Sequence, residues 1–419
     1  MVQIFFRCFL KTKNKEAEFF AQPLILNEVI MKNYTEILNE NRAWAEATFK
    51  KVDEKMAKVT LRSREKLADG VDENGLHKST PARNWTSGFW GGLNVMLYNY
   101  TKNEEYLKTA RRSEELLDEA LMDFKALYHD VGFMWHILSG ALYRVTGDEK
   151  SMNRNLHMAA NLSSRFVRYE EAPGGFIRAW NHAWQGLPVE NFSIIDCLMN
   201  LPILYWASDV IGDDRFKRIA MDHADMALMD HLRPDGSIVH IAQHNRDTGE
   251  LECTHGGQGY CVGSSWSRGQ AWGLYGFTLS YIHTGEERYL DAAKQVANYF
   301  IANCCDDWLP RVDFRAPSEP VLYDTTAGMC AACGLIELAK RLPENEGGMY
   351  MHAAVNMLKA IEAKFADYNP DRDDLITHGT VLYPNKEQQW GVVHISIIYA
   401  DYFFTEALLK LLGEEFLPW

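Results

Sequence analysis

Two aspartates, Asp130 and Asp196, each stand at the start of a long apolar segment, where a carboxylate is uncommon. Ionised aspartate is rarely buried without a partner, and a helix N-cap or first-turn position would explain either residue taken alone. Taken together, the two carboxylates could face each other across a small cleft, where desolvation and like charge would raise the pKa of one of them. A carboxyl group that stays protonated near neutral pH could protonate a sugar-derived substrate, at a glycosidic oxygen or at a carbon–carbon double bond.

Other common catalytic motifs are absent from the sequence. The string Gly263-Ser-Ser-Trp-Ser267 lacks the spacing of a G-x-S-x-G nucleophile turn, and there is no P-loop, no G-x-G-x-x-G after a strand and no H-E-x-x-H. The 14 histidines show no metal-ligand spacing. The C-x-x-C of Cys330 and Cys333 lies inside an apolar segment without a second pair, so we interpret both as small core residues. We therefore expect no metal and no organic cofactor.

Six apolar segments begin near polar or aromatic residues suited to sugar chemistry, and each is long and apolar enough to be a buried helix. If all six point the same way around a ring, their N-terminal ends line one funnel, and the long loops before them form its mouth. The segments are Gly91–Tyr100, Phe133–Val145, Ile194–Val210, Ala271–His283, Thr325–Leu342 and Ile395–Leu412.

A turn rich in Gly, Asn, Asp and Glu follows five of these segments, as in Thr146–Ser151. Gly or Asn would end one helix in a left-handed cap, and the acids would begin a half-exposed returning helix such as Tyr289–Asn303. Repetition of such helical hairpins predicts an all-α fold, an (α/α)6 barrel with long loops forming a site at one end. We expect one domain over residues 31–419, with residues 1–30 as a peripheral N-terminal extension. An open solenoid is the alternative, and Ser237–Ala242 would be a small hairpin in a loop.

Composition and charge argue against some classes of binding partner. The formal net charge of −14 argues against binding to nucleic acid or to an anionic membrane surface. No apolar run reaches the roughly 18 residues of a membrane span, and the short segment Val2–Leu10 is a poor signal peptide, so we expect a cytoplasmic protein, as a monomer or weak homo-oligomer. The 12 Trp and 19 Tyr residues either fill a large core or line a sugar-stacking cleft.

Several motifs resemble those of the unsaturated glucuronyl hydrolases, glycoside hydrolase family 88. They follow one another in the family's order, and their joint occurrence is more specific than any one of them. The strings are Asn84–Trp90, His129–Phe133, Ile194–Pro202, Trp266–Trp272 and Tyr399–Leu408. The resemblance implies an (α/α)6 barrel that removes a 4,5-unsaturated glucuronic acid from the non-reducing end of lyase-generated, glycosaminoglycan-type oligosaccharides. In this family an acid protonates C4 of the vinyl ether, water adds at C5, and the hemiketal collapses.

The same resemblance implies roles for individual residues. Asp196 matches the family's general acid/base, and Asp130 matches its second essential carboxylate. The substrate-contacting positions correspond to Trp85, His129, Trp180, His240, Gln258, Arg268 and Trp272. His244 is an alternative to His240. Arg268 would offer its guanidinium fork to the uronate carboxylate, or would form a structural salt bridge instead.

Departures from the family pattern leave other functions open. Gln258-Gly-Tyr is followed here by Cys261-Val-Gly-Ser264 rather than by Ser-Asp-Asp-Ser, which affects the expected leaving group more than the expected chemistry. A related alternative is an unsaturated rhamnogalacturonyl hydrolase built on the same barrel. A non-catalytic glycan-binding toroid would lack one of the two acids, and a sugar epimerase would need a pair of catalytic histidines.

Overall fold

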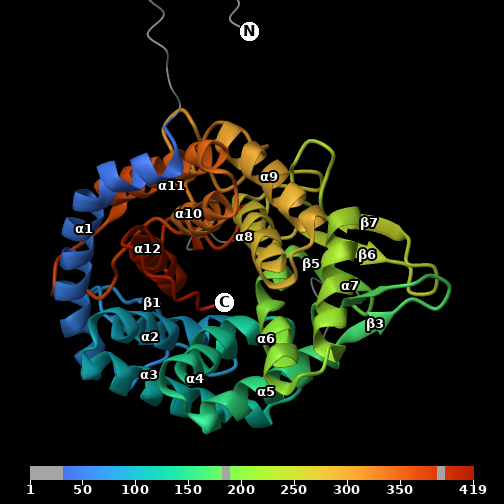
Figure 1. Ribbon diagram of the computed structural model, residues 1–419, viewed down its shortest axis with the longest axis horizontal. Helices are drawn as coiled ribbons and strands as arrows, with labels where there is room; N and C mark the ends of the chain where they lie inside the picture. The colour runs from blue at the N-terminus through green and yellow to red at the C-terminus, as the bar shows by residue number, and fades with distance from the viewer. Residues whose placement is uncertain (1–31, 182–188, 385–391) are drawn as a thin grey trace, which may run out of the picture.

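The computed structural model describes residues 32–181, 189–384 and 392–419, which form two concentric layers of helices arranged around a ring (Figure 1). The predicted N-terminal extension, residues 1–30, lies outside the described residues.

The inner layer is made by the six predicted apolar segments. Each inner element contacts the next, and the last, α12, packs against α2, so the ring is closed and the open solenoid is excluded. The inner elements are α2 (Phe89–Thr101), the π-helical η3 (Gly132–Gly140) with α4 (Ala141–Thr146), the 3-10 helix η4 (Ile195–Asn200) with α6 (Pro202–Ile211), α8 (Ser267–Thr284), α10 (Thr325–Lys340) and α12 (Ile398–Leu411).

The outer layer consists of the returning helices. Each packs on the inner helices of its own or the neighbouring hairpin, and α1 packs on α11, α12 and α3, so it covers the junction between the last and the first units. These helices are α1 (Tyr34–Arg62), α3 (Glu104–Leu117), α5 (Glu149–Ser163), α7 (Arg215–Asp230), α9 (Glu287–Ala302) and α11 (Glu344–Phe365). The ring of paired helices confirms the predicted fold class.

The turns between the layers have the predicted physical basis, with one difference. Gly147 ends α4 and Gly212 ends α6 in the left-handed conformation, at φ 74° and φ 67°. In the first hairpin this position is held by Lys102, at φ 59°, and not by the neighbouring Asn. Asn103 instead caps α3, because its side chain accepts a hydrogen bond from Glu105 N.

Short strands and 3-10 helices occupy the connections. The hairpin predicted at Ser237–Ala242 begins slightly later: β6 is the middle strand of an antiparallel three-stranded sheet with β5 and β7. The connecting elements are β1 (Ala68–Val71), β2 (His77–Ser79), η1 (Trp85–Gly88), η2 (Asp118–Met122), β3 (Phe166–Arg168), β4 (Gly175–Ile177), β5 (Phe192–Ile194), β6 (Ile241–His244) and β7 (Leu251–His255).

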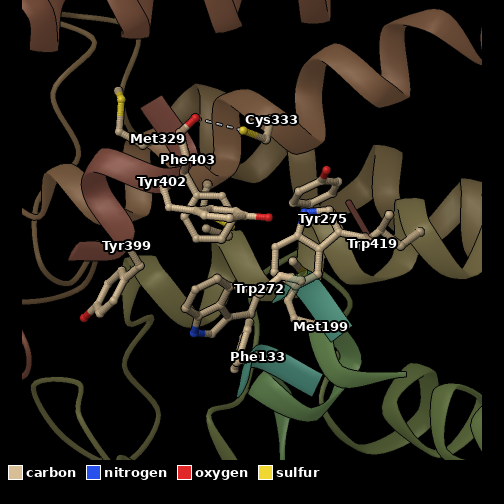
Figure 2. Close-up of a cluster of buried hydrophobic side chains, with 14 of the residues drawn as sticks. Phe133, Met199, Trp272, Tyr275, Met329, Cys333, Tyr399, Tyr402, Phe403 and Trp419 are labelled. Carbon is tan, nitrogen blue, oxygen red and sulfur yellow. Dashed lines mark hydrogen bonds between the residues drawn. The ribbon is translucent and has the colours of Figure 1, made fainter. Parts of the chain in front are cut away.

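Aromatic side chains fill the centre of the ring (Figure 2). Trp419 stacks on Phe403 of α12, with ring centroids 5.9 Å apart, and its indole N–H donates to the buried carboxylate of Glu406. Cys330 and Cys333 of α10 are buried free thiols within this core, as predicted. Within the described part of the chain, no helix is long and apolar enough to cross a membrane.

Candidate active site

A cavity of about 490 Å³ lies at the end of the ring where the inner helices begin. Eight of the nine residues predicted for the site line it, and Trp272 does not. The eight are Trp85, His129, Asp130, Trp180, Asp196, His240, Gln258 and Arg268. The two carboxylates that were predicted to meet therefore share one cavity.

Asp130 lies two residues before the π-helical η3, and its carboxylate is nearly buried. His129 Nε2 lies 3.1 Å from Asp130 Oδ1, and His129 Nδ1 lies 2.9 Å from the carbonyl oxygen of Ala179. Because a carbonyl only accepts, Nδ1 carries a proton, and protonation of Nε2 makes the ring a cation beside the carboxylate. Burial lowers the pKa of His129, but the carboxylates of Asp130 and Asp196 outweigh burial, so that this pKa is raised.

Asp196 is placed by strand pairing. Strand β5 pairs with β6, and the backbone N–H of Ile195 donates to the carbonyl oxygen of His240. This pairing brings the His240 imidazole to the Asp196 carboxylate, with Nε2 3.5 Å from Oδ1. The backbone N–H of Gln258 donates to His240 Nδ1 at 3.0 Å, so the proton of the neutral ring is on Nε2 and faces Asp196.

The electrostatics at Asp196 correct the expectation of a raised carboxyl pKa. Burial does raise the pKa of Asp196, but the neighbouring His240, His129 and Arg268 act in the opposite direction and hold it below its usual range. The two aspartates do share a cavity, yet each faces an imidazole, so like-charge repulsion does not dominate. Asp196 is therefore ionised in the free protein.

Geometry distinguishes the two histidines. His240 lines the cavity, whereas His244 is fully buried with its Nε2 3.1 Å from Asp230 Oδ2 and its ring against Phe176. A bulge in β6 between Gln243 and His244 breaks the register there. His244 therefore belongs to the packing behind the sheet.

Arg268 lines the cavity but does not present a free fork. One terminal nitrogen donates to Asp324 Oδ2 at 2.8 Å and the other to the carbonyl oxygen of Val381 at 2.6 Å, and the side chain is 1% exposed. The fork is thus engaged by protein acceptors, which is the structural salt bridge named as the alternative. Its charge still acts on Asp196.

The predicted stacking aromatics separate into two groups. Trp85 is half-buried in the cavity wall and packs on Tyr399 at 5.0 Å, and Trp180 meets the edge of His129 at 6.0 Å. Trp272 is fully buried among Phe133 and Phe403 (Figure 2). This corrects the expectation for Trp272: it is on the inward face of α8, so it belongs to the core rather than to the cavity wall.

Comparison with known proteins agrees with this site. No family model matches the chain. The unsaturated glucuronyl hydrolase of Bacillus sp. (strain GL1) is 35% identical over 352 residues, which cover 82% of this chain and 90% of that protein. The unsaturated chondroitin disaccharide hydrolase of Streptococcus agalactiae is 29% identical over 353 residues, 83% of this chain and 86% of that protein.

The solved structure of the Bacillus sp. GL1 hydrolase superposes with a TM-score of 0.77 and 31% identity, covering 84% of this chain and 94% of that one. The chain belongs to the unsaturated glucuronyl hydrolase family. It is therefore a glycosidase.

This unsaturated glucuronyl hydrolase also has cavity residues that the sequence reasoning did not find. Asp69 and Lys78 come from the β1–β2 hairpin, which precedes the first family-like motif, and Tyr399 is at the start of α12. Burial raises the pKa of Asp69, while Thr86 and the Lys78 charge oppose it. Lys78 is exposed and, within the described residues, has no carboxylate within 4 Å. Contacts of β1 with η1, α2 and α12 bring this hairpin to the site, and no motif in its own sequence indicated that position.

Proposed function

We propose that this enzyme releases 4,5-unsaturated glucuronic acid from the non-reducing end of lyase-generated, glycosaminoglycan-type oligosaccharides. The observation that carries the proposal is the meeting of Asp130 and Asp196 in one cavity, each beside an imidazole. The cavity volume of about 490 Å³ is in the range of small-molecule sites. Membership of the family, whose relatives are named for unsaturated glucuronyl and chondroitin disaccharide substrates, supports the same substrate class.

The proposed reaction is a hydration. The carboxyl group of Asp196 transfers its proton to C4 of the vinyl ether, the double-bond electrons form the new C4–H bond, and positive charge develops at C5 and the ring oxygen. Water then adds to C5 and gives its proton back to the Asp196 carboxylate. The product is a hemiketal at C5. Its ring opens to a ketone at C5 and leaves a hemiacetal at C1, which collapses to an aldehyde as the glycosidic bond breaks and the rest of the chain departs as an alcohol with the hemiacetal proton.

Asp196 must gain a proton before it can act as an acid. Because His240, His129 and Arg268 hold its pKa low in the free protein, we propose that the substrate supplies the opposing charge: a uronate carboxylate beside these three side chains weakens their effect on Asp196. The protonated form of His129, favoured by its raised pKa, is a nearby proton source. Substrate binding and acid formation are then coupled.

The test is turnover of defined substrates by the purified full chain. We expect loss of the ultraviolet absorbance of the vinyl ether with unsaturated chondroitin disaccharides, and no loss with Asp196→Asn. Turnover of an unsaturated rhamnogalacturonan disaccharide alone would instead support the sibling activity. Absence of turnover with every unsaturated uronide, together with retained glycan binding, would support the non-catalytic toroid.

Location and assembly are part of the same proposal. We place the enzyme in the cytoplasm as a monomer or weak homo-oligomer. The free, buried thiols of Cys197, Cys304, Cys330 and Cys333 are compatible with a reducing compartment. Cell fractionation tests the location, and sedimentation of the purified chain over a range of concentrations tests the assembly.

A further inference from the structure

A fully buried amide, Asn200, connects the two catalytic segments. It is the last residue of η4, one helical turn after Asp196, and it faces the start of η3. Its Nδ2 lies 3.3 Å from Asp130 Oδ1 and 3.2 Å from the carbonyl oxygen of Asp196. Its Oδ1 accepts the backbone N–H of Phe133 at 2.8 Å.

The orientation of this amide follows from its neighbours. The backbone N–H of Phe133 can only donate, so the amide atom that faces it is the oxygen. The amide nitrogen therefore points at two acceptors, the Asp130 carboxylate and the Asp196 carbonyl oxygen, and it has two hydrogens for them. A single orientation of the Asn200 amide therefore makes all three contacts, two through its nitrogen and one through its oxygen.

The backbone is shaped for this contact. A Cβ placed on Gly132 would lie 2.6 Å from Asn200 Oδ1 and 2.8 Å from its Cα, so only glycine lets η3 and η4 approach this closely. The Asn200 amide thus fixes the position of the Asp130 carboxylate.

We propose that Asn200 is a positioning residue for catalysis: it holds the Asp130 carboxylate at a fixed distance from the Asp196 backbone. This inference rests on the proposed function, in which both aspartates act on the substrate. The other titratable or charged groups around Asp130 are His129, Asp196, Tyr128, Cys197 and Arg165. Since Arg165 donates to the backbone carbonyls of Arg178 and Ala179, Asn200 adds an uncharged donor beside His129.

The decisive variant is Asn200→Asp, which keeps the size and the oxygen that accepts from Phe133. Its second oxygen can donate to Asp130 only while protonated, and repels Asp130 once ionised. We expect the kcat of this variant to be near that of the parent at acidic pH and at least tenfold lower at the alkaline end. The alkaline limb of its pH profile should lie about one pH unit lower than the parent's, and its KM should stay within twofold of the parent value.

Asn94→Asp is the matched control, because Asn94 is equally buried but bonds to Trp90 in α2 and Thr60 in α1. Its pH profile should keep the parent's shape.

A second measurement does not depend on turnover. Asn200→Asp should lose thermal stability as the pH rises, and this loss should disappear in the Asp130→Asn background, because the repelling charge is gone. An Asn200→Asp protein that folds only in the Asp130→Asn background supports the same contact. The proposal is overturned by a parallel pH profile, whether unchanged or uniformly lowered, by an equal stability loss in both backgrounds, or by failure to fold in both. If the parent turns over no unsaturated uronide, the proposed function fails, while the stability comparison still reports on the Asn200–Asp130 contact.

Discussion

His240 Nε2 lies 3.5 Å from Asp196 Oδ1, on adjacent strands that place the imidazole and the carboxylate on the same wall of the cavity. This pair reverses the electrostatics expected for two neighbouring aspartates, because each carboxylate is paired with an imidazole. We therefore propose that a bound anion, rather than burial alone, prepares the acid of the reaction.

Removal of the Asp196 carboxyl group should abolish turnover without abolishing binding. Asp196→Asn retains the shape but cannot deliver a proton, so we expect kcat to fall by about 10²- to 10⁴-fold. Steady-state kinetics and calorimetric binding of an unsaturated disaccharide give the two quantities. Asp230→Asn is the matched control, since Asp230 pairs with His244 behind the sheet, and it should keep kcat within about twofold. Unchanged turnover in Asp196→Asn would remove this residue from the mechanism.

The pH dependence of kcat/KM should report the low pKa of Asp196 in the free enzyme. Since the protonated fraction of an acid falls as the pH rises above its pKa, kcat/KM should be highest on the acidic side and decline toward alkaline pH. His240→Gln removes the main opposing influence, so the pKa of Asp196 should rise and the declining limb should move to higher pH by about one unit. A profile that is flat from roughly pH 5 to 8 contradicts this assignment.

Substitution of Trp85 should affect substrate binding, whereas substitution of Trp272 should affect the stability of the fold. Trp85→Ala removes a cavity-wall ring and should raise KM about three- to tenfold, because an aromatic stacking contact is worth about 0.5–1.5 kcal/mol. Trp272→Leu leaves a cavity in the core and should lower the free energy of unfolding by about 2–4 kcal/mol with KM unchanged. Denaturant unfolding and kinetics on both variants test the distinction, which reversed effects would refute.

Lys78 should favour substrates with an anionic group on the leaving sugar. Its exposed ammonium group lines the cavity from the β1–β2 hairpin, at a more open position than the buried carboxylates. We expect Lys78→Gln to lower kcat/KM about two- to fivefold for sulfated unsaturated disaccharides, most strongly at low salt, and to leave unsulfated ones unchanged. Equal effects on both substrates would exclude this role.

Stability should fall in mild acid because buried histidines are held neutral. Burial lowers the pKa of His231 to about 4, against about 6.5 in the unfolded chain. Between these values the unfolded state binds a proton that the folded state does not, so the free energy of unfolding decreases as the pH falls through this window, by on the order of 2 kcal/mol. Burial raises the pKa of Asp401 to about 7, which acts in the opposite direction because the folded state then holds the extra proton.

Thermal unfolding from roughly pH 7 to 4.5 measures this balance. His231→Gln should flatten the acid side of the curve, whereas His352→Gln, at an exposed position on α11, should not. An unchanged slope in His231→Gln would show that other groups control acid stability.

The sequence alone determined the helical hairpins and the two carboxylates. The apolar segments can be recognised from the sequence because a helix buried on all sides must be apolar throughout. Their boundaries agree with those of α2, α8, α10 and α12 to within a few residues. Asp130 and Asp196 were recognisable because a carboxylate at the start of such a segment conflicts with its surroundings.

Only the tertiary structure decided what surrounds those carboxylates. Strand pairing selected His240 over His244, helix rotation turned Trp272 into the core, and Asp324 engaged the guanidinium group of Arg268. Packing of β1 against η1, α2 and α12 brought Lys78 to the site from a hairpin outside the motifs. The physical reason is common to all of these: a side chain's direction and charge partners depend on residues distant in sequence, and a local pattern contains no information about which of them will be neighbours.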